Sequence, residues 1–118
     1  NSPDDMLHRM ETMVMMAGME LPLKAVRELV FSALEIILQI ARLSDGTRRI
    51  VSISEVATMY EGEIRLQELF HFVRTGISAE GRVNGYYTAT GVIPEFIEEV
   101  RQAGISMDMA VFVPTEDR

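Results

Sequence analysis

The 118-residue chain contains no cysteine, no tryptophan and a single lysine, Lys24. Without cysteine, the chain can form no disulfide scaffold, thiolate zinc site, iron–sulfur centre or cysteine nucleophile. A phosphate-binding P-loop needs Gly-Lys followed by Ser or Thr, whereas the lysine here lies in Leu23-Lys24-Ala25. This sequence therefore carries no P-loop.

A long apolar run is also missing. The most apolar stretch covers residues 29–43, but polar side chains interrupt it, so it falls short of the ~20 apolar residues of a membrane-spanning helix. The start, Asn1-Ser2-Pro3-Asp4-Asp5, lacks the basic region and apolar stretch of a secretory signal. We therefore expect a cytoplasmic protein without direct membrane insertion.

Acidic residues outnumber basic ones by 18 to 11, which gives a formal net charge of −7. Nucleic-acid-binding proteins neutralise phosphates with Lys and Arg, so this balance argues against a nucleic-acid partner. Hydrophobic residues make up 47% of the chain and charged residues 25%, which is typical of globular proteins. The length predicts a single domain over residues 1–118.

Signals for a helix open the chain. Ser2 is a suitable N-cap, Pro3 suits the first turn, and Asp5 completes a capping box. Gly18 is a natural stop, which predicts a helix over about residues 3–17. Its apolar face consists of Met6, Leu7, Met10, Met13, Val14 and Ala17.

A second helix is predicted over about residues 22–34. Its apolar face consists of Val26, Leu29, Val30, Ala33 and Leu34. Residues 35–43 are apolar on both sides and rich in β-branched side chains, which favours a strand, with one long helix over 22–43 as the alternative. The turn signal Asp45-Gly46 and an alternating strand at 48–54 then predict a hairpin.

The remaining sequence predicts more antiparallel strands, so that the sheet covers about residues 35–90. Glu61-Gly62 is the next turn signal, and the glycine-rich residues 75–85 predict a mobile loop. The residues expected to share one face of the sheet between them are Ile64, Leu66, Phe70 and Phe72. A short helix over about residues 94–103 follows. The fold class is therefore α+β, with a helix pair, an antiparallel sheet and a short C-terminal helix.

Six of the nine methionines lie between Met6 and Met19. Methionine is flexible and polarizable, so a methionine-rich helix either fills a core or forms an adaptable binding surface. The core interpretation is favoured for most of them. Met15, Met16 and Met19 lie outside the apolar face and are candidates for contact with another subunit or domain.

The search for catalytic and metal-binding patterns is negative. His8 and His71 have no partner at metal-ligand spacing, so we interpret them as surface or interface residues. The pairs Asp4-Asp5 and Glu98-Glu99 are adjacent on predicted helices, where neighbours face apart, and they make poor acid–base pairs. We predict no catalytic, cofactor-binding or metal-binding residue in this chain.

Three arginines, Arg42, Arg48 and Arg49, bracket the predicted hairpin turn. The hairpin would bring them to one end of the sheet. Arginine binds phosphate and carboxylate groups through paired hydrogen bonds, also across subunits. We therefore interpret the three as possible subunit-interface residues, the alternative being strand-end charges that pair with Glu35 or Glu55.

Short segments along nearly the whole chain form one ordered set. They are Asn1-Ser2-Pro3-Asp4-Asp5, Arg9-Met10-Glu11-Thr12-Met13, Met16-Ala17-Gly18-Met19, Leu21-Pro22, Ala25-Val26-Arg27, Arg42-Leu43-Ser44-Asp45-Gly46-Thr47-Arg48-Arg49, Ile53-Ser54-Glu55-Val56, Leu66-Gln67-Glu68-Leu69-Phe70 and Ala89-Thr90-Gly91-Val92-Ile93-Pro94. The set resembles the type II/type IV secretion ATPases, and within that family the CpaF/TadA-like motors of Flp (Tad) pilus assembly. Residues 106–118 match the family least well.

The resemblance implies that the chain is the C-terminal piece of a longer motor. In that family the His box immediately precedes the Asn-Ser-Pro segment, and the Walker motifs lie further upstream. It implies the end of a RecA-like ATPase domain, with residues 36–43 as a strand paired with residues 48–57. The complete motors are hexamers at the cytoplasmic face of the inner membrane, bind ATP and Mg²⁺, and act with membrane platform proteins.

Two functions follow as hypotheses. In the first, the chain is part of an ATP-hydrolysing motor, is inactive alone, and serves packing, subunit contact and transmission of motion. In the second, it is a freestanding α+β interaction module that binds a partner through Met15, Met16 and Met19. A Gly-Lys-Ser/Thr loop upstream in the reading frame would favour the first function, and a start codon near Asn1 would favour the second.

Overall fold

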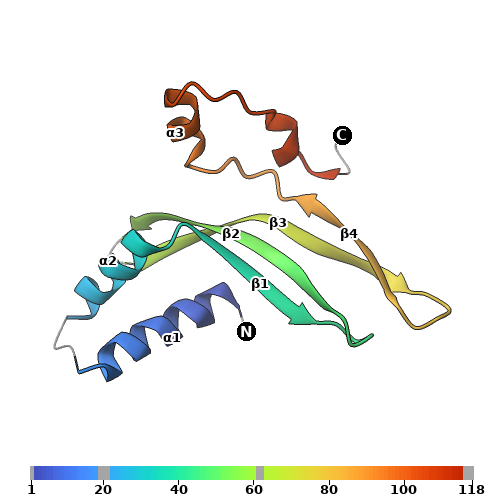
Figure 1. Ribbon diagram of the computed structural model, residues 1–118, viewed down its shortest axis with the longest axis horizontal. Coiled ribbons are helices and arrows are strands. Elements are labelled where there is room, and N and C mark those ends of the chain that lie inside the picture. The colour runs from blue at the N-terminus through green and yellow to red at the C-terminus, as the bar shows by residue number, and fades with distance from the viewer. Residues whose placement is uncertain (1, 19–21, 61–62, 116–118) are drawn as a thin grey trace.

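The computed structural model describes residues 2–18, 22–60 and 63–115. Its elements, in chain order, are α1 (Pro3–Met16), α2 (Leu23–Ala33), β1 (Ile36–Arg42), β2 (Arg48–Tyr60), β3 (Glu63–Ile77), β4 (Val83–Ala89), α3 (Ile97–Gln102) and the 3₁₀ helix η1 (Met109–Phe112). Figure 1 shows the described strands as one antiparallel sheet in the order β1-β2-β3-β4. The predicted α+β class is therefore confirmed. The predicted Glu61-Gly62 turn lies outside the described residues.

The start of α1 is set by its own sequence. Asp5 donates its backbone N–H to the Ser2 hydroxyl at 3.1 Å, and Ser2 donates its backbone N–H to the Asp5 carboxylate at 3.1 Å. This reciprocal pair is the predicted capping box. At the other end, Gly18 takes a φ of +81°, a left-handed conformation that favours glycine, and the helix stops.

β1 is a strand, and the alternative of one long helix over 22–43 is wrong. Leu34 leaves helical conformation with φ −113° and ψ 135°. Residues 36–42 then pair with β2, so Ile37 lies opposite Ser54 and Arg42 lies opposite Arg48. The β-branched side chains of this segment favour an extended backbone, and that backbone forms its hydrogen bonds with β2.

The expected mobile loop at 75–85 is also wrong. β3 continues to Ile77 and β4 begins at Val83, so the connection is a short turn. Gly85 lies inside β4, where a Cβ atom would collide with the Val73 carbonyl oxygen and the Phe72 ring. The glycine thus permits close strand pairing and does not indicate a loop.

α1 and α2 pack on one face of the sheet (Figure 1). The buried residues of this core are Leu7, Val30, Ile37 and Val56. Arg27 on α2 donates its Nε hydrogen to Glu11 Oε1 on α1 at 3.1 Å, which joins the two helices. Not every residue of the predicted apolar faces is buried in this core: Met13 of α1 is 61% exposed and Leu29 of α2 is 51% exposed.

The C-terminal segment crosses the opposite side of the sheet (Figure 1), where the Phe70 ring lies 5.9 Å from the Phe112 ring. Ile64 and Leu66 instead pack against the helix core. The expectation that Ile64 and Leu66 share one face of the sheet with Phe70 and Phe72 is therefore wrong. The cause lies in the pairing of β2 with β3, because Ser54 pairs with Glu68 and Ile53 pairs with Phe70, which leaves Leu69 as an extra residue in β3. Such a bulge shifts the alternation of a strand. α3 is also shorter than the predicted 94–103.

Candidate functional site

The β1–β2 register separates the three predicted interface arginines. Arg42 lies directly opposite Arg48, whereas Arg49 lies opposite Ala41. Directly opposite residues share a face and adjacent residues alternate, so Arg42 and Arg48 come together and Arg49 projects from the other side. The Arg49 guanidinium carbon lies 5.4 Å from the Phe72 ring centroid. Neither Arg42 nor Arg48 has a partner among the described residues, and neither pairs with Glu35 or Glu55.

The turn of this hairpin is fastened to the neighbouring hairpin. Asp45 accepts hydrogen bonds from the Thr47 hydroxyl at 2.6 Å, the Thr47 backbone N–H at 2.9 Å and the Val83 backbone N–H at 2.8 Å. Arg74 on β3 also donates to the Ser44 hydroxyl at 2.7 Å. The Thr47 hydroxyl, followed by the Val83 N–H, lowers the pKa of Asp45 to about 2. The hairpin end is therefore held in one orientation.

Glu55 connects the sheet to the C-terminal segment. Its side chain is buried, at 4% exposure, and accepts hydrogen bonds from the Glu95 N–H at 2.9 Å, the Phe96 N–H at 3.0 Å and Gln67 Nε2 at 3.1 Å. These are the backbone donors just before α3 that would otherwise lack an acceptor. Glu55 is thus a structural anchor, a role that sequence reasoning missed because its donors lie 40 and 41 residues away.

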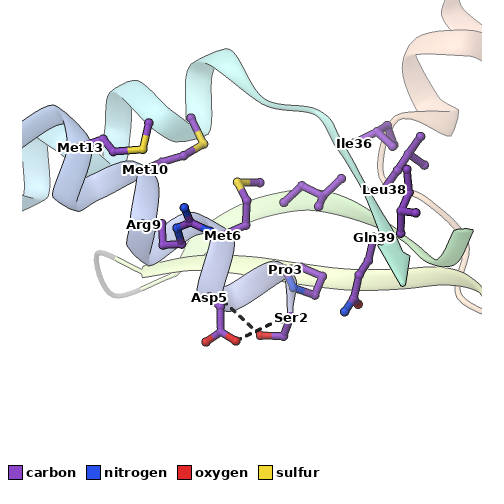
Figure 2. Close-up of a pocket in the computed structure, with 12 residues that line it drawn as sticks. Ser2, Pro3, Asp5, Met6, Arg9, Met10, Met13, Ile36, Leu38 and Gln39 are labelled. Atoms are coloured by element: carbon purple, nitrogen blue, oxygen red, sulfur yellow. Dashed lines mark hydrogen bonds between the residues drawn. The ribbon is translucent and has the colours of Figure 1, made fainter. Parts of the chain in front are cut away.

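A groove of about 480 Å³ runs between α1 and β1. Met6, Arg9, Met10 and Met13 of α1 line it, and Figure 2 shows Met6 next to the space beside β1, with Met10 and Met13 further along α1. β1 pairs with β2 on one side only, so its other edge has no strand partner in the described part of the chain. The groove therefore follows an open sheet edge with an apolar lining.

A second hollow, of about 650 Å³, lies between α2, β1 and α3. We call it the acidic pocket, because the charged residues lining it are Glu35, Glu55, Glu95 and Glu99, with no Lys or Arg among the described residues. Its apolar walls include Phe31, Ile36, Phe96, Val100 and Ile105. The Glu35 and Glu99 carboxylates are exposed and make no ion pair or hydrogen bond with another described residue. No local sequence pattern predicted this pocket.

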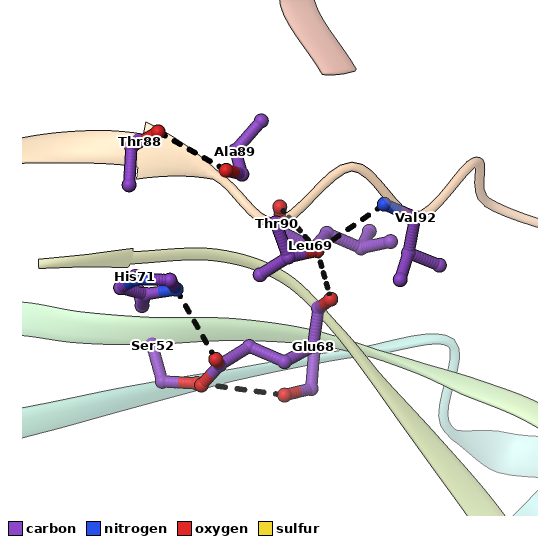
Figure 3. Close-up of polar contacts among 9 residues, drawn as sticks. Ser52, Glu68, Leu69, His71, Thr88, Ala89, Thr90 and Val92 are labelled. Carbon is purple, nitrogen blue, oxygen red and sulfur yellow. Dashed lines mark hydrogen bonds and ion pairs between the residues drawn. The ribbon is translucent and has the colours of Figure 1, made fainter. Parts of the chain in front are cut away.

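A polar cluster surrounds His71 (Figure 3). Ser52 donates its hydroxyl hydrogen to Glu68 Oε2 at 2.7 Å, and His71 Nδ1 lies 3.3 Å from Glu68 Oε1. That imidazole nitrogen is enclosed and makes no hydrogen bond with a described residue. Because Glu68 takes the Ser52 hydrogen and lies between the two side chains, His71 is not placed as a base for a serine nucleophile. We interpret the cluster as structural, with Ser52 and His71 both next to the Glu68 carboxylate.

The candidate methionines are surface residues where the structure describes them. Met15 is 51% exposed and Met16 is 80% exposed, and Met19 lies outside the described residues. His8 is also exposed on α1. The C-terminal end of α1, which carries Met15 and Met16, lies away from the hairpin with the three arginines, which is at the far end of β1 (Figure 1).

The surroundings of Lys24 differ from those of a phosphate-binding loop. Lys24 is an exposed residue in the first turn of α2, with Pro22 and Leu23 before it in place of a glycine-rich loop. Within residues 2–18, 22–60 and 63–115, no three Asp, Glu or His side chains gather as metal ligands. Across the same residues, no helix is long and apolar enough to cross a bilayer.

Comparison of the chain with known protein families and with characterised proteins gives no match.

Proposed function

We propose that this chain is the C-terminal portion of a hexameric ATPase that powers type II/type IV-like secretion or Flp pilus assembly. The ordered set of segments that resembles the CpaF/TadA-like motors supports this proposal. In it, ATP and Mg²⁺ are bound by the upstream part of the motor, because the chain itself has no glycine loop to hold phosphate. The chain serves packing, subunit contact and transmission of motion to inner-membrane platform proteins.

The open edge of β1 is the structural observation that carries the proposal. Ile36, Leu38 and Ile40 alternate along this edge strand and are 41%, 52% and 62% exposed. An apolar edge strand without cover pairs readily with another strand. The groove beside it begins at Ser2 and Pro3, so a strand entering α1 would run next to β1. This arrangement suits the margin of a larger RecA-like sheet.

The proposal is tested by comparing the chain alone with the motor that contains it. The 118-residue chain should hydrolyse no ATP, and ATP with Mg²⁺ should not shift its melting temperature. Joined to an upstream segment that holds the Gly-Lys-Ser/Thr loop, it should become part of an active hexamer. ATP hydrolysis by the isolated chain would overturn the proposal.

The role of Arg42 and Arg48 in subunit contact can be tested in the same complete motor. Arg42→Ala with Arg48→Ala should lower the hexamer population or the ATPase activity, because both guanidiniums lack partners within the subunit. Lys24→Ala with Arg65→Ala is the matched control, since it also removes two exposed positive charges. Equal effects of the two pairs would show that Arg42 and Arg48 make no special subunit contact.

The exposure of the methionines supports a second candidate function. Met15 and Met16 form an exposed apolar end of α1, which suits a freestanding interaction module that binds through its methionines. Met15→Gln with Met16→Gln would then abolish partner binding without loss of stability. Unchanged partner binding in this variant would contradict the second function.

A further inference from the structure

The tip of the β1–β2 hairpin carries two exposed positive charges. Arg42 and Arg48 lie directly opposite each other, are exposed, and have no acidic partner among the described residues. Like charges in this register repel each other. The nearby turn carboxylate, Asp45, is already occupied by Thr47 and Val83. The tip therefore holds two guanidiniums ready for an external anion.

An apolar pair lies next to these charges. Ile40 and Ile50 are directly opposite each other, and each is two residues from an arginine, so all four side chains share one face. Ile40 is 62% exposed and Ile50 is 36% exposed. The tip thus fits an anionic surface with an apolar floor better than it fits an isolated phosphate.

The acidic pocket has the complementary properties. Its free carboxylates, Glu35 and Glu99, lie beside the apolar walls formed by Phe31, Phe96 and Val100. Because β1 leads from the pocket at Ile36 to the tip at Arg42, the two are about 20 Å apart along the strand. The tip therefore cannot enter the pocket of its own chain. The hairpin is also fastened at Asp45, so little freedom is lost on binding.

We propose that the hairpin tip of one copy inserts into the acidic pocket of a second copy, with Arg42 and Arg48 pairing with Glu35 and Glu99. Such a contact joins two different surfaces head to tail, which closes a ring when the rotation fits. The proposal deepens the subunit contact of the proposed function and rests on it for the ring. The contact itself needs only this chain, which carries both surfaces.

The test exchanges the charges of the two surfaces. The 118-residue chain should associate in sedimentation velocity at low salt, and salt should weaken the association. Arg42→Glu with Arg48→Glu, and separately Glu35→Arg with Glu99→Arg, should each weaken association about tenfold or more. An equimolar mixture of the two variants should associate again, because each tip then meets an opposite charge.

Arg9→Glu with Lys24→Glu is the control for Arg42→Glu with Arg48→Glu, since it lowers the net charge by the same amount at exposed sites outside both surfaces. This control should associate as the original chain does. A monomeric original chain, association unaffected by either charge reversal, or a mixture as dissociated as its components would each overturn the contact. Assembly into closed dimers alone would overturn the head-to-tail arrangement.

Cysteine trapping keeps the proposal testable if a reversed variant fails to fold. The chain has no cysteine, so Arg42→Cys with Glu99→Cys should give a ladder of disulfide-linked copies under mild oxidation. Arg42→Cys with Thr12→Cys, which places the second thiol on the exposed side of α1, should give far less. Equal ladders would overturn the contact. Because no nucleotide is involved, either result is independent of the ATPase test.

Discussion

The Asp45 carboxylate accepts the backbone N–H of Val83 at 2.8 Å, although the two residues are 38 positions apart. This bond joins the turn between β1 and β2 to the first residue of β4. Together with the Arg74–Ser44 hydrogen bond, it holds the two hairpins at the same end of the sheet. The orientation of the hairpin tip therefore depends on the Asp45 carboxylate and on the Arg74–Ser44 hydrogen bond.

The Asp45 bonds predict a pH dependence of stability. The Thr47 hydroxyl and the backbone N–H groups favour the charged carboxylate and lower the pKa of Asp45 from 3.8 to about 2. Because the folded pKa is lower than the unfolded one, this contribution is fully present above pH 3.8 and is lost as the pH falls through about 2. When the pH is lowered through this range, the free energy of unfolding of Asp45→Asn, measured by urea titration, should therefore fall less than that of the original chain.

The exposed Glu80 in the β3–β4 turn provides the control for this experiment. Glu80→Gln removes one carboxylate without disturbing the junction of the hairpins. If the free energy of unfolding changes with pH in the same way for Asp45→Asn and Glu80→Gln, the hydrogen bond from Val83 to Asp45 contributes no acid-sensitive stability.

Removal of the Glu55 anchor should release the C-terminal segment. In Glu55→Ala, the N–H groups of Glu95 and Phe96 lose their acceptor, and we expect a loss of about 1–3 kcal/mol of unfolding free energy. Glu55→Gln should lose less, because its remaining carbonyl oxygen can still accept. Hydrogen exchange at Glu95 and Phe96 is the direct measurement, and unchanged exchange in Glu55→Ala would refute the anchoring role.

The methionines of α1 should divide into two groups by stability. Met10 packs partly buried against the core of Leu7, Val30, Ile37 and Val56, so Met10→Gln should cost about 1–3 kcal/mol by burying an amide. Met15→Gln with Met16→Gln should stay within about 0.5 kcal/mol of the original chain, because both side chains are exposed. Chemical denaturation measures both, and similar losses in the two variants would argue against this packing.

The adjacent residues Arg48 and Arg49 should differ in their effects. Arg49→Ala removes the contact with the Phe72 ring and should cost about 0.5–1 kcal/mol. Arg48→Ala removes a like charge opposite Arg42, so the isolated chain should be unchanged or slightly more stable. The comparison is made by thermal unfolding at low salt. A larger loss in Arg48→Ala than in Arg49→Ala would contradict the register.

Local chemistry made some elements predictable. The Ser2–Asp5 capping box and the Gly18 stop lie within a few residues of the groups they satisfy, so α1 ends within one residue of its predicted bounds. Alternation on one strand could also have separated Arg48 from Arg49, because neighbouring residues face opposite sides. The extent of β3 was not predictable, since Gly76 and Gly85 read as loop residues until their strands pair.

The sequence by itself determined the α+β class, the bounds of α1 to within one residue, the hairpin at Asp45-Gly46 and the absence of a P-loop. Each depends on the residue types present or on bonds between near neighbours. Only the tertiary structure decided that Glu55 anchors the segment before α3, that Asp45 joins two hairpins, and that Glu35 and Glu99 share a pocket. Those contacts join residues far apart in the chain, and no local pattern specifies which distant backbone groups a side chain will meet.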